Sequence, residues 1–161
     1  MQKKFNFNKY AFNLSGFSVK FLSKRNRMKR LIYSSCSSEN IDFKIVGEIL
    51  THAVKKNKEK SITGMMVYDG KYFLQCIEGD EALIDDLWKK LTEDTRHHSL
   101  YINGTEFDDK RLFPDWNMGY MNNRQEIQKI INSITGNKIF SPETLNYTHA
   151  KLLLLQLSFI L

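Results

Sequence analysis

Three polar side chains stand at positions where this chain could do chemistry. Gln75 interrupts the apolar run Lys71–Ile77, and burying its amide without partners would cost about 1–3 kcal/mol. Tyr33 lies in another apolar run, Arg30–Ser35, and Asn57 follows a segment with helical spacing. A phenol beside a primary amide forms a hydrogen-bonding chain with both a donor and an acceptor, which suits a planar heterocycle with a carbonyl and a ring nitrogen. The alternative is that Tyr33 and Gln75 only satisfy each other in the core.

Other kinds of site have little support in the sequence. The spacing of the histidines does not suit a metal, and the two cysteines give no disulfide framework, which favours a reducing cytoplasm. A glycine-rich phosphate loop is absent, and the serines around Tyr33 lack a nucleophile-elbow pattern. We therefore expect no metal site and no enzymatic activity. The side chains considered are His52, His97, His98, His149, Cys36 and Cys76.

The positive charge is concentrated at one end of the chain. The 161 residues carry a net charge of +6, but residues 1–27 hold seven Lys and Arg and no acid. The remaining residues carry 17 Lys and Arg against 18 Asp and Glu, a net charge of −1. We expect residues 1–27 to be a basic extension that is disordered or not native. Because the folded body is not basic, we expect no direct nucleic-acid binding, and no apolar run is long enough to span a membrane.

Hydrophobic spacing predicts an α+β fold with the order β-α-β-β-α-β-β. Asp69-Gly70 between two strand-like runs predicts a hairpin with a type I′ turn. Glu78–Asp80 is expected to end the third strand, with Asp80 capping the second helix. This order is typical of a ferredoxin-like sheet with both helices on one face and the first and third strands central. The first helix is expected to run to about Lys56, with Asn40 or Asp42 as its cap. The other predicted elements are Arg30–Ser35, Ile62–Tyr68, Lys71–Ile77, 81–93, Leu100–Phe107 and Asp115–Met121.

Two further helices are expected after this unit. One covers about Arg124–Ser133, and the other starts at Ser141-Pro142, where serine suits the N-cap and proline the first helical position. The second helix is rich in leucine, so we expect it to cover the other face of the sheet or to pack in an oligomer. The chain therefore divides into residues 1–27, residues 28–122 and the C-terminal helices of residues 123–161.

Five motifs in order make the chain resemble the BLUF family, blue-light sensors that use a flavin. The resemblance covers Met28 to about Asn122, and the segment 140–146 is similar to the tail of short bacterial members without an effector domain. The motifs are Leu31–Ser35, Asn57 with Ser61–Gly64, Phe73–Gly79, Asp94–His97 and Phe113–Gly119.

The resemblance implies that the cofactor is FAD, with its ring between the two helices. Tyr33 would then be the electron donor to the photoexcited flavin, and Gln75 the amide that bridges the tyrosine and the flavin. Asn57 would bind the pyrimidine edge. Asp94 and Arg96 would lie near the ribityl chain and phosphate. Apolar walls would come from Ile49, Phe73 and Leu91.

The resemblance also implies an output through protein contacts. Trp116 and Met118 lie two residues apart on the last predicted strand, so we expect them to share a face and to pass the change at Gln75 to the C-terminal helices. The expected partner is a separate protein effector or transcriptional regulator in the cytoplasm, with self-association. Two positions depart from the family, since Lys56 replaces a neutral or histidine side chain and Ala53 a serine found in some relatives. The alternative function is a light-insensitive flavin-binding or protein-interaction module.

Overall fold

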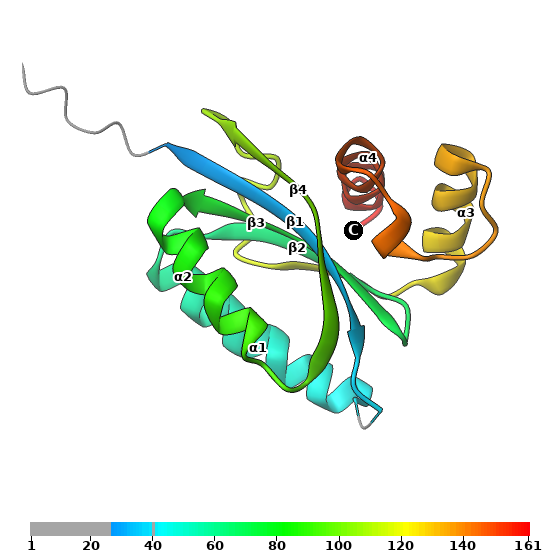
Figure 1. The fold of residues 1–161 in the computed structure, drawn as a ribbon, viewed down its shortest axis with the longest axis horizontal. Helices are drawn as coiled ribbons and strands as arrows, with labels where there is room; N and C mark the ends of the chain where they lie inside the picture. Colours follow the sequence, from blue (N-terminus) through cyan, green and yellow to red (C-terminus); the bar gives the residue numbers. More distant parts are fainter. Residues whose placement is uncertain (1–26, 40) are drawn as a thin grey trace, which may run out of the picture.

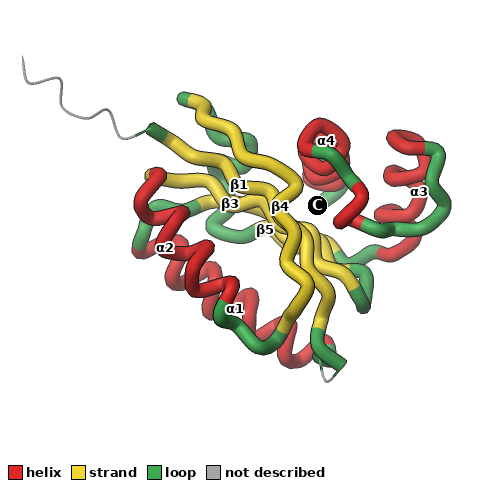
Figure 2. Tube along the Cα trace, in the orientation of Figure 1, coloured by secondary structure: helices red, strands yellow, loops and turns green. Residues whose placement is uncertain are grey.

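The computed structural model describes residues 27–39 and 41–161, so the N-terminal extension, Arg27 excepted, lies outside the described residues. One five-stranded sheet has the order β4-β1-β3-β2-β5. Helices α1 and α2 cover one face, and α3 and α4 lie on the other (Figures 1 and 2). The predicted α+β fold is thus confirmed. The strands are β1 (Met28–Ser37), β2 (Thr63–Tyr68), β3 (Tyr72–Asp80), β4 (His97–Asp108) and β5 (Gly119–Met121), and the helices are α1 (Phe43–Glu59), α2 (Glu81–Thr92), α3 (Arg124–Thr135) and α4 (Tyr147–Ser158).

Side-chain caps fix where the first two helices begin. The Asp42 carboxylate accepts a hydrogen bond from the backbone N–H of Ile45 at 2.8 Å. The Asp80 carboxylate does the same for Ala82 at 3.0 Å, as the sequence predicted. Each cap satisfies a backbone N–H in the first turn of its own helix.

Successive residues of β3 serve the two faces of the sheet. Gln75 points toward α1 and α2, and Cys76 is buried among the side chains of the α3 and α4 layer. Cys76 is therefore the small core residue that its place beside Gln75 predicts. The α1/α2 side buries Leu31, Val46, Ile62, Met66, Tyr68, Phe73, Ile77, Ile84 and Met118.

The β2–β3 hairpin forms, but its predicted type I′ turn is wrong. Gly70 has a φ of +98°, while Asp69 does not adopt the positive φ that this turn needs at both central residues. Instead, the Asp69 carboxylate accepts hydrogen bonds from the N–H groups of Lys71 and Tyr72 at 2.9 and 2.8 Å. The Asp69 side chain thus closes the loop of residues 69–71 between β2 and β3, in place of the two-residue turn that was predicted.

Three predicted boundaries also change. The third strand continues through Glu78–Asp80, because β1 starts at Met28 and pairs with it along its whole length. The fifth strand shrinks to β5, which runs parallel to β2, since the residues before it turn around the Phe113–Trp116 stack. The helix expected from Ser141 is a short 3₁₀ turn, Pro142–Thr144, and α4 begins later, capped by Asn146.

A cluster of charged side chains joins the sheet to α4. Arg30 is fully buried and donates to Glu78 at 2.7 Å and also to Glu106. The same Glu106 oxygen accepts from the hydroxyl of Tyr147 at 2.5 Å and from Lys151 at 2.8 Å, both on α4. The charge of one β4 carboxylate therefore holds α4 against β1 and β4.

We expect Glu106→Gln to flatten the loss of stability in acid. Hydrogen bonds from Lys151 and Tyr147 lower the pKa of Glu106 to about 2 from an ordinary value of 4.5. Because the folded-state pKa is depressed, the carboxylate stabilises the fold above pH 4.5, and this contribution is lost as the pH falls from 4.5 to about 2. Urea unfolding at pH 7, 4 and 3 measures it. A variant that loses stability with acid as steeply as the parent would contradict this role.

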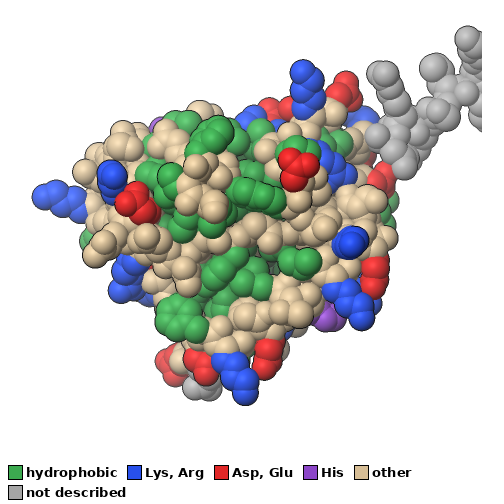
Figure 3. Space-filling model, turned by 180° about the vertical axis from the view of Figure 1, so that it is seen from behind, with side chains coloured by type: hydrophobic (Ala, Val, Ile, Leu, Met, Phe, Trp, Pro, Cys, Tyr) green, Lys and Arg blue, Asp and Glu red, His purple; other side chains and the backbone are tan. Residues whose placement is uncertain are grey.

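One face of the protein carries charges of both signs. On the face seen in Figure 3, Lys and Arg side chains are interspersed with Asp and Glu and do not form a continuous basic surface. This distribution agrees with the near-neutral charge of residues 28–161. Within the described part of the chain, no helix has the length and apolar content needed to cross a membrane.

Candidate functional site

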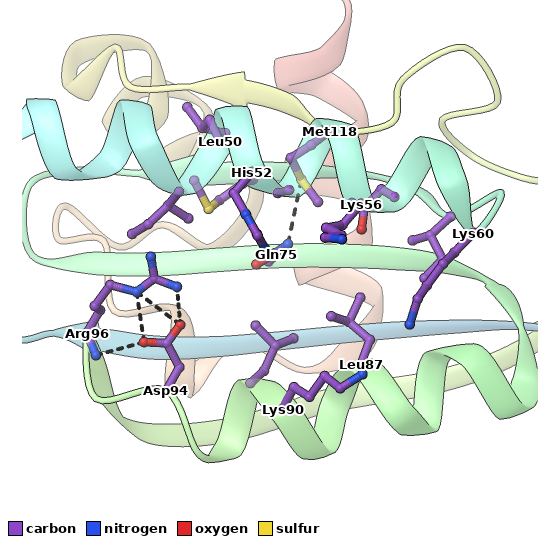
Figure 4. Close-up of a pocket in the computed structure, with 16 residues that line it drawn as sticks. Leu50, His52, Lys56, Lys60, Gln75, Leu87, Lys90, Asp94, Arg96 and Met118 are labelled. Atoms are coloured by element: carbon purple, nitrogen blue, oxygen red, sulfur yellow. Dashed lines mark hydrogen bonds and ion pairs between the residues drawn. The ribbon is translucent and has the colours of Figure 1, made fainter.

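A cavity of about 400 Å³ opens between α1 and α2 above β3. Gln75 lies at its centre, with Met118 above it from the segment before β5 (Figure 4). A smaller hollow of about 40 Å³ adjoins it and is lined by Tyr33 and Phe73. The size falls in the usual range for small-molecule sites, which are mostly apolar with a few placed polar groups. The apolar side chains along its walls are Ile49, Leu50, Ala53, Ile62, Met66, Leu87 and Leu91.

Strand register places the tyrosine and the glutamine together. Tyr33 on β1 is the direct antiparallel partner of Gln75 on β3. The Tyr33 hydroxyl donates to Gln75 Oε1 at 2.5 Å, and Gln75 Nε2 points to Met118 Sδ at 3.6 Å. The amide therefore sits between a phenol and a weak sulfur acceptor, and it lines the cavity. The predicted contact between Tyr33 and Gln75 is present.

Burial keeps the Tyr33 phenol protonated. Desolvation raises the pKa of Tyr33 well above its ordinary value, and the negative charge of Asp94 adds to the rise. The Trp88 ring lies edge-on to the Tyr33 ring with centroids 5.1 Å apart. Tyr33 is thus a packed, neutral hydrogen-bond donor whose acceptor is Gln75.

Asp94 and Arg96 form an ion pair at one end of the cavity, drawn with dashed lines in Figure 4. Arg96 Nε lies 2.9 and 3.1 Å from the two Asp94 oxygens, and a second guanidinium nitrogen lies 2.5 Å from one of them. Hydrogen bonding by Arg96 lowers the pKa of Asp94, so the carboxylate is ionised. Each residue neutralises the other.

Asn57 lies in the last turn of α1, because this helix runs to Glu59 rather than ending at Lys56 as predicted. Asn57 is 4% exposed as a whole residue, and it lines the cavity. One amide N–H donates to the carbonyl of Asn117 at 2.7 Å, which ties α1 to the segment before β5. An oriented amide is therefore held at the cavity wall.

All the site residues proposed from the sequence line this cavity or the hollow beside it, except Trp116. Ile49, Asn57, Gln75, Leu91, Asp94, Arg96 and Met118 line the cavity, and Tyr33 and Phe73 line the adjoining hollow.

Trp116 is the exception, and the expectation that it shares a face with Met118 is wrong. Trp116 packs with the α3 and α4 layer, stacked on Phe113 with ring centroids 5.9 Å apart. Its indole also covers Gly119, where a Cβ atom would lie 2.4 Å from the ring. Met118 packs with the α1/α2 layer. The period-two rule does not apply, because these residues precede β5 and are not in a strand.

Some lining residues did not follow from sequence reasoning. His52, Lys60 and Lys90 face the cavity (Figure 4). Their positions are four residues before Lys56, four after it, and one before Leu91. Helical spacing from Lys56 could have found His52 and Lys60, whereas Lys90 is adjacent to Leu91, and neighbouring residues of a helix do not share a face.

The cavity suits a flavin on the chemistry of its lining. Apolar walls from two helices would cover the faces of a planar ring, and the amides of Asn57 and Gln75 offer donors and acceptors to its carbonyl and nitrogen edge. The donor set therefore fits the cofactor implied by the sequence motifs.

Known proteins match the same region. The curated relatives include photoactivated adenylate cyclase subunit beta of Euglena longa, 29% identical over 93 residues, or 56% of this chain and 11% of that protein. The blue light- and temperature-regulated antirepressor BluF of Escherichia coli is 27% identical over 70 residues, 44% of this chain and 17% of that protein. The chain thus spans well under a fifth of these relatives' length.

A solved structure of similar size agrees more closely. The photo-activated state of BlsA has a TM-score of 0.75 and 29% identity, covering 81% of this chain and 94% of that one. The family model described as sensors of blue light using FAD matches residues 28–119, from the start of β1 to the start of β5. This match takes in every wall of the cavity, and the chain therefore belongs to the BLUF family, the sensors of blue light using FAD.

Proposed function

We propose that this chain is a blue-light receptor that holds FAD in the cavity between α1 and α2. The observation that carries the proposal is the hydrogen-bond chain from Tyr33 through Gln75 to Met118 at the cavity wall. Ile49, Leu91 and Phe73 would bound the ring, and Asn57 would bind its polar edge. When bound, FAD would supply blue-light absorption and an oxidising excited state.

Tyr33 is the electron donor in this proposal. A phenol that loses an electron becomes a strong acid, and the nearest acceptor for its proton is Gln75 Oε1, 2.5 Å away. Because burial opposes the tyrosinate, Tyr33 recovers its proton when the electron returns. The Gln75 amide is left rearranged, by rotation or tautomerisation. The end that faces Tyr33 then donates instead of accepting, and the end that faces Met118 accepts instead of donating.

The change at Gln75 reaches the far face of the sheet through Met118. Met118 contacts Gln75, and Trp116, two residues earlier, packs with the α3 and α4 layer. We infer that a shift of Met118 moves Trp116 and with it the packing of the C-terminal helices. The segment thus connects the two faces without a strand between them.

The output is contact with a separate protein. One matched relative is named as a blue light- and temperature-regulated antirepressor, and in this chain the matched region leads into α3 and α4. We propose a protein effector or transcriptional regulator in trans, self-association of the chain, and action in the cytoplasm. The free thiols of Cys36 and Cys76 support the last point, because a reducing compartment keeps thiols unpaired.

Absorption spectroscopy of the whole chain tests this proposal. We expect purified protein to be yellow and to show a small, reversible shift of the flavin bands to the red after blue light. The shift follows from a stronger hydrogen bond to a ring carbonyl when Gln75 is rearranged. A colourless protein from flavin-replete cells would overturn the proposal, and bound flavin without a shift would leave a light-insensitive binding module.

A further inference from the structure

The cavity is lined by more basic than acidic side chains, although a flavin ring is neutral. The basic lining side chains are Lys56, Lys60, Lys90 and Arg96, with His52 beside them. Among the described residues that line the cavity, Asp94 is the one acidic side chain. The excess charge suits a ligand that carries an anionic group.

Two of these cations already have a carboxylate of their own. Arg96 is held by Asp94 through three contacts of 2.5 to 3.1 Å. Lys56 lies 3.5 Å from Glu59, one turn along α1. Arg96 is therefore a poor candidate for the phosphate contact that the family resemblance suggests.

Lys60 and Lys90 differ, because they share one carboxylate oxygen. Asp86 Oδ2 lies 3.2 Å from Lys60 Nζ and 2.7 Å from Lys90 Nζ. Lys60 follows α1 and Lys90 lies on α2, so the pair bridges the two helices. Both lysines line the cavity and Asp86 does not. One carboxylate thus fixes two ammonium groups at the cavity and leaves a net positive charge there.

We propose that Lys60 and Lys90 form an anion subsite that binds the phosphate of a flavin nucleotide, so that this chain selects FAD and FMN over riboflavin. The inference rests on the proposed function. Phosphate oxygens can accept from both ammonium groups at once, because each ammonium has three donors and Asp86 uses one direction. Hydrogen bonding by Asp86 also raises the pKa of Lys90, which keeps that group charged.

Dark equilibrium dialysis of the flavin-free full-length chain tests this selectivity with FAD, FMN and riboflavin. FMN and riboflavin differ only by the phosphate, so their ratio isolates the subsite. We expect FMN and FAD to bind on the order of tenfold more tightly than riboflavin at low salt, as two partly exposed charge contacts allow, and less so at high salt.

Lysine variants test whether the preference for phosphorylated flavins comes from this subsite. The double change Lys60→Ala and Lys90→Ala should weaken FMN and FAD binding about tenfold and leave riboflavin binding unchanged, with Lys89→Ala on the exposed side of α2 as the matched control. Riboflavin binding as tight as FMN binding, or an equal loss from Lys89→Ala, would overturn the subsite while leaving the receptor proposal intact. Failure of all three flavins to bind would overturn both.

Discussion

Gln75→Leu is expected to keep bound flavin and to abolish the reversible red shift. Leucine fills a similar volume in the cavity wall but has no donor or acceptor, so Tyr33 loses its partner at 2.5 Å and Met118 loses the amide at 3.6 Å. The apolar walls that hold the ring are untouched. Absorption spectra before and after blue light measure the change.

The matched control for this change is Gln125→Leu, on the exposed surface of α3. This variant should cycle like the parent, which separates the loss of one amide from the general effect of adding a leucine. An unchanged photocycle in Gln75→Leu would refute the central role given to this amide. The unpaired Tyr33 hydroxyl should also cost about 1–3 kcal/mol of stability.

Arg30→Met is expected to lower the free energy of unfolding by about 3–5 kcal/mol. Arg30 and Glu78 both have side chains with no exposed surface, and methionine keeps the aliphatic volume but removes the charge. Glu78 would remain buried without its cation, although it still accepts from the N–H groups of Leu112 and Phe113. Urea unfolding at pH 7 measures the loss.

Two further variants make this result specific. Lys29→Met removes the neighbouring ion pair with the exposed Asp85, and it should cost no more than about 1 kcal/mol. Adding Glu78→Gln to Arg30→Met should recover part of the loss, because it removes the buried charge while the single amide oxygen still accepts from one of the two backbone N–H groups. If Arg30→Met cost as little as Lys29→Met, the buried pair would not have the stabilising role assigned to it.

The sequence correctly predicted the sheet and the helices that cover it, because the patterns that specify them lie within short segments of the chain. Helical spacing around Val46 and Ile84, with a cap expected at Asn40 or Asp42 for α1 and at Asp80 for α2, is enough to place both helices, and the structure selects Asp42. The pairing of Tyr33 with Gln75 followed from the strand order typical of this class of sheet. These features depend on residues close in sequence or on a common topology.

The errors arose where tertiary contacts override local preference. Glu78 reads as a strand end, yet it continues β3 because Arg30 neutralises it in the core. Trp116 and Met118 read as one strand face, yet a turn at Phe113–Trp116 sends them to opposite layers. The grouping of Lys60 with Lys90 is not a local pattern either, since it depends on Asp86 reaching across from α2 to the end of α1.

The hydrogen-bond chain from Tyr33 through Gln75 to Met118 joins segments far apart in the sequence, which bears on how the protein accumulates in a cell. Tyr33 and Gln75 are 42 residues apart, and Gln75 and Met118 are 43 apart. The cavity is therefore complete only after the whole sheet has formed, so an unfolded or partly made chain has no place for flavin. A ligand that binds only the folded state stabilises it by mass action. We expect cellular flavin supply to set how much of this protein survives proteolysis, before any light arrives.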